Sequence, residues 1–569
     1  MQSARAHILP CIFVLYCVFS APFVRAELLW PIDRPRQITG TFCESRGTRF
    51  HYGIDISCAG KKGFPIYAVD DGHVSTVIYE KWGIGYAVFV THRNGLKSFY
   101  GHMDRFAPDV LRNTRVTAYE KNILDRKDFR VDLGEKDLAV TRGMILGYSG
   151  DSGIGKEHFH FELRNGDNVN LNPLKYGISV PDVSPPVFSE VRMAPLDGYA
   201  AVNGGIDEVS YNVQADNNKG PYRLSGGAVP RIAGRVGVKV VVYDRAGYTS
   251  RVAPYKIELH VNNAKTYEIV FDTSSRADAR RMGLVYDYNE TSGSRYTYYL
   301  YSRISGGGLL DTANISGNIP ITIVAYDASG NTSVLSMQIR AERPLDTPAY
   351  VLTPNLKVGR KLRLNSSDSA CMVEFDTRAA LYDESITLAQ YAPFPSPMQG
   401  LSVVSNVYDV APSNLCTMTP ANISIACNEN SREKVGMYSL DRKSNTFFFV
   451  GNMYNARKKA FNARVFKMGG FFLLKDEIPP VIHSKAIVKA RRGNGIKIKV
   501  SDIGHGLDLD AVTLRVDGVD VVWYYDFDYG YIEILPHNAI WQKGRHAITL
   551  QVVDLAGNKS EVKTIEYSI

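Results

Sequence analysis

A short turn signature recurs three times in this sequence, and it constrains the fold more than any other feature. Each copy follows a run of apolar, strand-forming residues and reads Asp-x-x-Gly, at Asp244–Gly247, Asp327–Gly330 and Asp554–Gly557. An Asp side chain accepts hydrogen bonds from backbone amides two residues on, and Gly adopts the positive φ that tight turns need. Each copy therefore predicts a hairpin turn between the last strands of a β-sandwich.

A second repeated signature marks where domains begin. Asp182 and Asp476 are each followed, three residues later, by Pro-Pro-Val. A Pro pair continues neither a helix nor a central strand, so each copy starts a new domain. The sequence therefore predicts an all-β chain that consists of a signal peptide at 1–26, a β-sheet domain at 27–178, an immunoglobulin-like β-sandwich at 179–345, a β-rich domain at 346–474 and a second immunoglobulin-like β-sandwich at 475–569.

The first 26 residues are typical of a secretory signal peptide. Arg5 precedes an apolar run from Ile8 to Phe19, and the small-x-small pattern of a cleavage site ends at Ala26. Lipidation at Cys17 is disfavoured because Tyr16 is too large for the position before a lipidated cysteine. No later stretch reaches the ~20 apolar residues of a membrane helix. We expect an exported protein without a transmembrane segment, in the periplasm or at the cell surface of a bacterial envelope.

The charge pattern excludes one class of partner. A net charge of +8 is spread over 569 residues, and Lys and Arg form no basic stripe. Nucleic-acid binding requires such a stripe, so no nucleic-acid partner is expected. A mildly basic surface is compatible with weak attraction to an anionic wall or membrane.

The cysteines leave the disulfide pattern open. The sequence has seven cysteines, two of which lie in the predicted signal peptide. Export permits disulfides, and the pairs Cys43 with Cys58 and Cys416 with Cys427 have suitable spacings, although spacing proves neither. No C-x-x-C spacing suggests a zinc knuckle, and nothing supports thiolate catalysis.

Histidines in the N-terminal third form three constellations. His51 and Asp55 stand four residues apart, His102 follows Tyr100-Gly101, and the third group is His158-Phe159-His160-Phe161-Glu162. Side chains two apart in a strand point to the same face, so His158 and His160 project together. Imidazoles combined with one carboxylate suit zinc, and three protein ligands leave the fourth position open, as catalytic zinc sites do.

Residues 48–175 resemble the lysostaphin-type (LytM-like) zinc metallopeptidase family, whose pattern H-x-x-x-D, Y-x-H and H-x-H-F-E they contain in order. The resemblance implies a β-sheet peptidase domain in which His51, Asp55 and His160 hold one zinc ion. It also implies that His102 and His158 flank the metal-bound water, one as general base and the other at the oxyanion or leaving group. The sequence does not assign which does which. Glu162 orients a ligand or forms a surface salt bridge.

Two features depart from the family's usual pattern. Lys156-Glu157 replaces Gly-Pro before the second histidine pair, and Phe159 replaces Leu, which predicts a more charged rim near the metal. A longer insertion, roughly Leu111 to Lys136, is expected to narrow or cover the groove. Neither change removes a ligand.

The leading hypothesis is an exported zinc metalloendopeptidase that hydrolyses the peptide cross-links of bacterial peptidoglycan. The alternative is a non-catalytic LytM-like regulator that activates a cell-wall amidase, although such regulators usually lack metal ligands. A third reading, in which the β-sandwiches bind an envelope protein partner, is compatible with either of these.

Overall fold

The computed structural model describes residues 27–568, apart from short gaps at 81–82, 114–115, 117–127, 154–156, 217–219, 246–249, 428–431, 443, 484–487, 490–495, 522, 527–528 and 535–543. The predicted signal peptide at 1–26 lies outside the described residues. β-strands dominate the described chain, so the predicted all-β fold is confirmed. Its one α-helix among the described residues is the single turn α1 (Pro108–Leu111). No helix in this part of the chain has the length and apolar character needed to cross a membrane.

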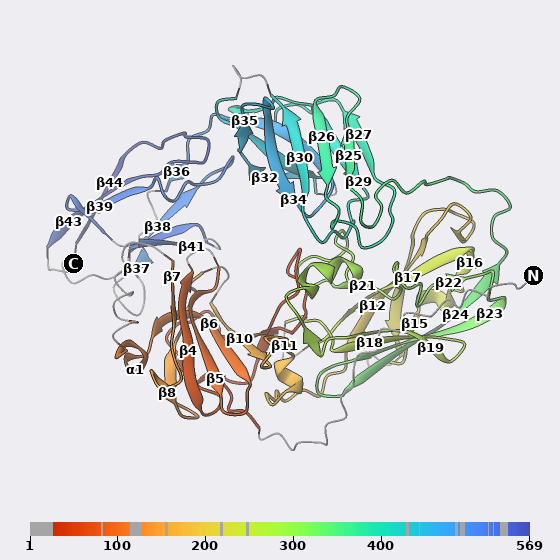
Figure 1. Cartoon of the computed structure of the whole chain (residues 1–569), viewed down its shortest axis with the longest axis horizontal. Helices are drawn as coiled ribbons and strands as arrows, with labels where there is room; N and C mark the ends of the chain where they lie inside the picture. Colours follow the sequence, from red (N-terminus) through yellow and green to blue (C-terminus); the bar gives the residue numbers. More distant parts are fainter. Residues whose placement is uncertain are drawn as a thin grey trace, which may run out of the picture.

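The first sheet places the predicted site residues on adjacent strands. Its strand order is β1-β2-β10-β6-β5-β4-β7 (Figure 1). The bounds of these strands are β1 Ile38–Gly40, β2 Ile54–Ser57, β4 Gly72–Glu80, β5 Gly85–His92, β6 Lys97–Phe106, β7 Phe129–Asp132 and β10 His158–Arg164. β10 lies between β2 and β6, and His160 pairs with Asp55 on one side and Gly101 on the other.

Alternation along β10 separates the core from the site. Phe159 and Phe161 are fully buried and pack into the core of the first sheet, together with Ile54 and Ile56 of β2. Successive side chains of a strand point to opposite faces, so His158 and His160 share the other face. The apolar residues between the histidines therefore anchor the strand that presents them.

The first sheet extends beyond the predicted domain boundary at residue 178. Short strands complete it, and one of them, β20, comes from much later in the chain and pairs with β11. Leu171 pairs with Thr273, and Asn170 pairs with Ser274. The short strands are β3 Pro65–Tyr67, β8 Ala139–Val140, β9 Ile145–Ser149, β11 Asn170–Leu171 and β20 Thr273–Ser274; the 3-10 helix η1 spans Pro173–Lys175.

The second sheet follows in sequence, in the order β19-β18-β23-β24-β15-β14-β12-β17-β21. Its strands are β12 Val187–Pro195, β13 Ala201–Val202, β14 Val209–Ala215, β15 Tyr222–Leu224, β16 Arg231–Ala233, β17 Arg235–Tyr243, β18 Lys256–Val261, β19 Ala264–Val270, β21 Thr297–Tyr299, β22 Leu310–Asp311, β23 Gly317–Tyr326 and β24 Thr332–Glu342, with 3-10 helices η3 Ser225–Gly227 and η4 Asp278–Leu284. Strand β17 has eight consecutive buried residues, which places it in the interior.

Three residues from the segment before β2 belong to the core of the second sheet. Phe42, Cys43 and Phe50 are at most 6% exposed and cluster with Phe271 and Tyr286. The Phe50 ring centroid lies 6.4 Å from that of Phe271 and 6.2 Å from that of Tyr286. The segment that leads to His51 is therefore held by residues that lie more than two hundred positions later.

The rest of the chain forms two pairs of facing sheets, each pair around its own core. The first pair contains β25 Leu362–Asn365, β26 Cys371–Phe375, β27 Thr387–Tyr391, β28 Leu401–Val403, β29 Val407–Ala411, β30 Ala421–Ala426, β31 Val435–Asp441, β32 Thr446–Gly451, β33 Tyr454–Asn455, β34 Ala460–Val465 and β35 Gly470–Asp476. The second contains β36 Val481–Ile482, β37 Val488–Lys489, β38 Ile496–Ser501, β39 Thr513–Val516, β40 Val519–Asp520, β41 Trp523–Asp526, β42 Tyr531–Ile534, β43 Arg545–Gln551 and β44 Lys563–Ser568. The domain limits and the immunoglobulin-like classification stay predictions.

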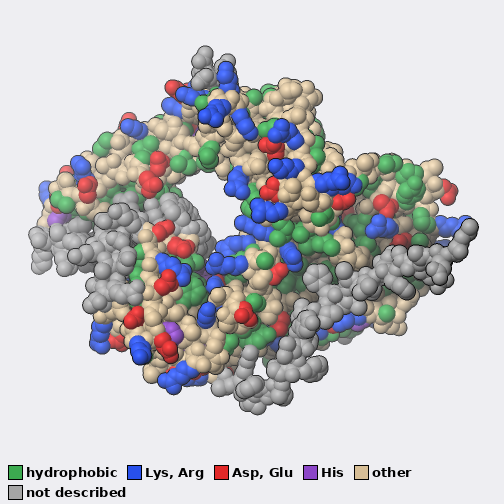
Figure 2. Space-filling model, viewed as in Figure 1, with side chains coloured by type: hydrophobic (Ala, Val, Ile, Leu, Met, Phe, Trp, Pro, Cys, Tyr) green, Lys and Arg blue, Asp and Glu red, His purple; other side chains and the backbone are tan. Residues whose placement is uncertain are grey.

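The parts of the chain are arranged in a ring (Figure 1). The space-filling view shows an opening through its centre, with Lys and Arg side chains gathered along one rim (Figure 2). The last pair of sheets lies close to the first sheet. Burial raises the pKa of Asp151, and Glu533 and Lys497 of the last pair are near enough for their charges to act on it as well. Asp151 precedes Ser152, whose carbonyl contacts a predicted catalytic histidine.

The hairpin prediction is right for two of the three turn signatures. The turn after Asp327 joins β23 to β24 and the turn after Asp554 joins β43 to β44, and both strand pairs are antiparallel neighbours. At the third signature, Asp244 and Val252 exchange two backbone hydrogen bonds across residues 246–249, which lie outside the described residues. The expected hairpin does not continue into the long strands, because β17 pairs with β12, β21 and β22, whereas β18 pairs with β19 and β23. A turn sequence favours a local change of direction, and long-range packing decides which strands pair.

The proposed disulfide pairs are wrong for this structure. The five cysteines of the described chain form no disulfide with one another. Cys58 packs into the core of the first sheet and Cys43 into the core of the second, so their side chains lie in separate hydrophobic clusters. Cys416 Sγ contacts the carbonyl of Arg280 at 3.3 Å.

Candidate metal centre

Three of the predicted site residues converge on one point. His51 Nε2 lies 3.0 Å from His160 Nδ1 and 3.1 Å from Asp55 Oδ1, and His160 Nδ1 lies 2.9 Å from that same Asp55 oxygen. Two ligands of a tetrahedral zinc ion, each at about 2.0–2.2 Å from the metal, lie roughly 3.3–3.6 Å apart. The three atoms are thus spaced nearly as a zinc ligand set requires, with a small outward shift on binding.

Each of the three side chains is oriented by a second contact. His51 donates from Nδ1 to the carbonyl of Thr41 at 2.8 Å, which leaves Nε2 to face the other two residues. His160 contacts Glu162 Oε1 through Nε2 at 3.2 Å, which leaves Nδ1 to face Asp55. The partner of the outer imidazole nitrogen fixes which nitrogen a metal can bind. Both histidines therefore present a defined nitrogen to the common point.

Arg46 holds the carboxylate of the set, and the sequence reasoning missed it. The Arg46 guanidinium donates to Asp55 Oδ2 and forms an ion pair with Glu44 at 3.2 Å. Glu44 is 1% exposed and also accepts a hydrogen bond from Tyr296, which lies in the second part of the chain. Arg46 thus turns Oδ1 of Asp55 toward the histidines. No motif contains Arg46 or Glu44, so only the fold identifies them.

The ionisation of Asp55 suits a metal ligand. Burial alone would raise the pKa of this carboxyl, but the charges of His51 and His158 and the hydrogen bond from His160 outweigh burial and hold the pKa well below its usual range. Asp55 is therefore an anion at neutral pH. A carboxylate and two imidazoles are a donor set that zinc favours.

Glu162 belongs to a buried network. Its side chain is 5% exposed, accepts from Asn170 at 2.9 Å and pairs with Arg164, while it contacts His160 through the other oxygen. Burial raises the pKa of Glu162, but His160 and Arg164 outweigh this effect and lower it to about 2. Glu162 is thus ionised and buried against His160.

We expect Glu162→Gln to weaken zinc binding without changing the ligand set. The amide keeps the shape of the side chain but removes the charge that fixes the proton on His160 Nε2. Loss of such an outer partner typically lowers metal affinity about 10–100-fold. Competition with a chromogenic chelator measures the change, and Glu477→Gln on the surface serves as the matched control. An affinity equal to that of the wild type would contradict this orienting role.

His102 and His158 lie beside the three converging residues. Their ring centroids are 4.5 Å apart, and His158 Nε2 is 3.6 Å from Asp55 Oδ1. His102 donates from Nδ1 to the carbonyl of Ser152 at 2.9 Å, which leaves the lone pair on Nε2. Its φ of 54° is in the left-handed region, which is costly for a residue with a side chain. The backbone is thus strained where His102 joins the site.

The imidazoles differ in protonation before a metal binds. Burial, together with the neighbouring histidines, lowers the pKa of His102 to about 3. Burial also lowers the pKa of His51 to about 4. For His160, burial is outweighed by hydrogen bonds to Asp55 and Glu162, which raise its pKa to about 9. At neutral pH His160 therefore carries a proton that a metal ion must displace.

Zinc binding is therefore expected to release about one proton per ion between roughly pH 5 and 8, because only His160 is both protonated and a candidate ligand in that range. Since its pKa is raised, the site becomes harder to fill as the pH falls, and the affinity should drop about tenfold per pH unit. Above pH 9 the dependence should flatten. Calorimetry in buffers of different ionisation enthalpy counts the protons, and a pH-independent affinity from pH 5 to 8 would refute this prediction.

The two departures from the family pattern fall in different places. Phe159 is fully buried in the core of the first sheet, so its side chain does not line the rim. The expectation that it alters the rim is wrong, because alternation turns it away from His158. Lys156 lies outside the described residues. The insertion begins at the last residue of α1 and includes β7, and its residues 114–115 and 117–127 lie outside the described residues.

Two other histidines of the first sheet, His73 and His92, lie outside the candidate site. His92 is 3% exposed and hydrogen bonds to Ser98 and to the carbonyl of Asp71. His73 lies in β4 and pairs with Thr91, and His92 lies in β5 and pairs with Gly72. Neither joins the converging set.

Comparison with known proteins identifies the region that carries this site. Residues 49–121 match Peptidase family M23. They contain His51, Asp55 and His102, and they end before His158. A DD-carboxypeptidase/endopeptidase, Mpg, from Neisseria meningitidis serogroup B is 28% identical over 138 residues, which are 24% of this chain and 25% of that protein. The chain thus spans about a quarter of the length of the curated relatives it matches.

Two solved structures are similar to part of this chain. The catalytic domain of a variant of the prophage-encoded M23 protein EnpA from Enterococcus faecalis is 26% identical and covers 27% of this chain and 98% of its own, with a TM-score of 0.19. A zinc-containing peptidase from Vibrio cholerae is 23% identical and covers 28% of this chain and 41% of its own, also with a TM-score of 0.19.

Proposed function

From the peptidase M23 (LytM-type) domain that this chain contains at residues 49–121, we propose that the protein is an exported zinc metalloendopeptidase that hydrolyses peptide cross-links of bacterial peptidoglycan. The observation that carries the proposal is the convergence of His51 Nε2, Asp55 Oδ1 and His160 Nδ1 within 3.1 Å of one another. Each of these atoms is turned inward by a separate partner, which is typical of a built metal site.

In this proposal His51, Asp55 and His160 hold one zinc ion. Bound zinc would supply Lewis-acid polarisation of the scissile carbonyl and a water that is acidic enough to attack at neutral pH. Thr41, Arg46 and Glu162 hold the three ligands in place. These contacts fix the ligand geometry before substrate arrives, which reduces reorganisation during the reaction.

His102 and His158 are the proposed catalytic residues. The Nδ1 hydrogen of His102 is committed to the carbonyl of Ser152, so its Nε2 is available to take a proton. Burial and the neighbouring histidines lower the pKa of His102, so this nitrogen is unprotonated at neutral pH. His158 then hydrogen bonds the developing oxyanion or the leaving group. This division of roles favours His102 as the base.

The wall substrate is supported by three independent features. The relatives that match this chain include a DD-carboxypeptidase/endopeptidase, and the N-terminal sequence is typical of an export signal. Lys and Arg line one rim of the opening through the ring (Figure 2), where they would attract an anionic polymer. The three later β-rich parts would position the peptidase domain on the wall or bind an envelope protein.

The test combines metal content with digestion of the proposed substrate. The purified protein is analysed for zinc and then incubated with isolated peptidoglycan, and the released fragments are separated by mass. We expect about one zinc ion per chain, as for a catalytic site with one metal, and fragments cut within the peptide cross-links. If the protein holds zinc, releases no peptidoglycan fragments and stimulates an added wall amidase, the regulatory alternative is correct instead.

A further inference from the structure

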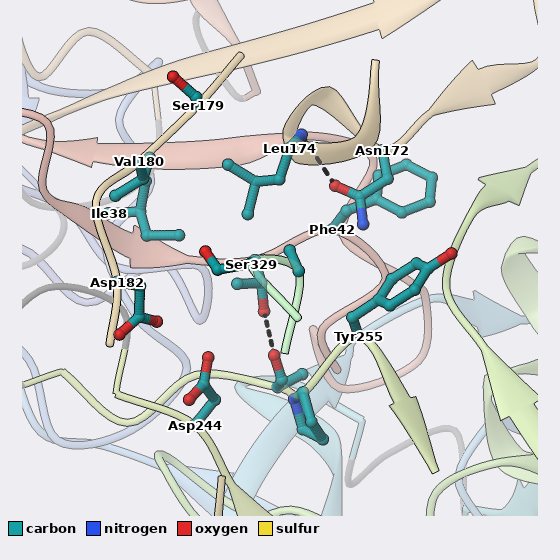
Figure 3. A pocket seen from close by; sticks show the side chains of 14 residues that line it. Ile38, Phe42, Asn172, Leu174, Ser179, Val180, Asp182, Asp244, Tyr255 and Ser329 are labelled. Carbon is teal, nitrogen blue, oxygen red and sulfur yellow. Dashed lines mark hydrogen bonds between the residues drawn. The ribbon is translucent and has the colours of Figure 1, made fainter. Parts of the chain in front are cut away.

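A second set of potential ligands lies where the chain leaves the peptidase domain. Asp182, Asp244 and Asp327 each place a carboxylate oxygen within 4.8 Å of the others. They come from three segments: the connection that leads to β12, the end of β17 and the turn between β23 and β24. Figure 3 shows the carboxylates of Asp182 and Asp244 facing each other in one cavity. The repeated Asp signatures of the sequence thus meet at one place.

One of these carboxylates has an oxygen that nothing satisfies. Asp244 is 4% exposed, and its buried Oδ1 has no hydrogen-bond partner in the described structure. Among the described residues, no Lys or Arg forms an ion pair with any of the three carboxylates. An unpaired polar atom in the interior costs free energy unless a ligand or ion satisfies it. Burial, increased by the charges of Asp182 and Asp327, raises the pKa of Asp244 to about 8.

The surrounding backbone holds the three carboxylates in this costly arrangement. Asp327 accepts from both the backbone and the side-chain amide of Asn331, at 2.8 and 2.6 Å. The same Asn331 side chain donates to the carbonyl of Asp182 at 3.1 Å, and Asp182 accepts from the amide of Ser184 at 2.9 Å. These contacts orient the carboxylates of Asp327 and Asp182 and tie the Asp182 backbone to Asn331, and none of them supplies a positive charge. A bound cation would supply it.

We propose that Asp182, Asp244 and Asp327 bind a calcium ion that fixes the peptidase domain to the β-sheets that follow it. The donors are all oxygen atoms, which hard cations select and zinc disfavours. Calcium accepts irregular sets of 6–8 oxygens, whereas magnesium demands a nearly ideal octahedron. Ligands drawn from three separate segments match the calcium preference. Three carboxylates also give the site enough charge to bind a divalent ion.

A second group of three converging carboxylates lies near the C-terminus and provides a comparison. Asp476, Asp502 and Asp554 also converge, and Asn558 bridges Asp554 and the carbonyl of Asp476 as Asn331 does in the first set. Here, however, His505 contacts Asp476 through both its backbone amide and Nδ1. Asp502 Oδ1 of this set also has no hydrogen-bond partner among the described residues, but the His505 ring contacts one of the carboxylates, and no ring does so in the first set. The C-terminal set therefore serves as a matched control.

The three carboxylates Asp182, Asp244 and Asp327 lie at the junction between the peptidase domain and the second sheet. The cavity beside it, of about 140 Å³, is lined from the peptidase side by Ile38 and Phe42 and from the other side by Tyr255. Lys175 donates to the carbonyl of Ala328, the residue after Asp327. A calcium ion would join the connecting segment to two loops of the second sheet. It would therefore stiffen the junction that supports the peptidase domain.

The test is a calcium titration of the full protein after removal of bound metals and addition of one equivalent of zinc. Calorimetry and thermal melting are recorded for the wild type, for Asp244→Asn and for Asp554→Asn. We expect the wild type and Asp554→Asn to share a calcium-binding step that Asp244→Asn lacks. We also expect calcium to raise the melting temperature of the first two proteins and not that of Asp244→Asn. Magnesium at the same concentration should bind at least tenfold more weakly.

Metal-free controls separate a binding role from a purely structural one. Without calcium, Asp244→Asn should melt at or above the temperature of the wild type, because it replaces a buried carboxyl that has no counter-charge with a neutral amide. The proposal is overturned if calcium binds none of the proteins, or if Asp244→Asn binds it as the wild type does. It is also overturned if Asp244→Asn is equally destabilised with and without calcium, since that outcome assigns the carboxylate to the fold alone.

Discussion

His51→Ala should lose its zinc, whereas His102→Ala should keep the metal and lose catalysis. His51 supplies one of the three converging atoms, so its removal leaves Asp55 and His160 as the only two ligands of the set. His102 lies outside that set. Removal of a general base typically lowers a rate about 10²–10⁴-fold, so kcat/KM of His102→Ala should fall in that range at an unchanged zinc content. Elemental analysis and a defined cross-linked muropeptide substrate measure the two quantities separately.

A histidine outside the site provides the control for this pair. His483 is exposed and lies in the last part of the chain, where it contacts Ser501. His483→Ala should retain both zinc and activity. If His102→Ala lost zinc together with His51→Ala, His102 would be a ligand rather than the proposed base. If His51→Ala retained one zinc ion, the ligand set inferred from the three converging atoms would be wrong.

Phe50→Ala should destabilise the protein by about 3–5 kcal/mol, the usual cost of removing a large aromatic side chain from a core. Phe50 is 6% exposed and packs against Phe271 and Tyr286, although it immediately precedes His51 in the chain. The same variant should weaken zinc binding, because the cavity frees the segment that positions His51. Chemical denaturation and chelator competition measure the two effects on one protein sample.

Two further variants test whether the loss of stability and the loss of zinc binding in Phe50→Ala have the same cause. Phe448 is 59% exposed, and Phe448→Ala should change the stability by no more than about 0.5 kcal/mol and leave zinc binding intact. Phe50→Leu, which refills most of the space, should recover most of the zinc affinity. Stability lost in Phe50→Ala without any change in zinc binding would show that the later part of the chain does not hold the site.

Much of the metal centre was predictable because its determinants are local. The spacing of His158 and His160 fixes a shared strand face, and the alternating Phe159 and Phe161 point to the other face, into the core. The order of the motifs then indicated that His51, Asp55 and His102 belong to the same site as this pair. Such inferences need only the periodicity of a strand and the chemistry of the donors.

The parts that the sequence did not reveal depend on long-range packing. Arg46 and Glu44 belong to no motif, yet together they orient Asp55 and connect it to Tyr296. The turn at Asp244 was expected to join two paired strands, but its strands pair elsewhere. In both cases the deciding contact is made with a residue that is remote in sequence, and local turn chemistry carries no information about it.

The shared core around Phe50 also determines when the segment before His51 can fold. Tyr286, which donates to the carbonyl of Cys43, follows it by 243 residues. A chain that emerges from its N-terminus, during synthesis or during passage across a membrane, displays His51 long before its supporting residues arrive. Domains that fold as they emerge do so from the N-terminus onward, and this one has to wait. The segment that carries His51 therefore reaches its packed state only after more than half of the polypeptide has been delivered.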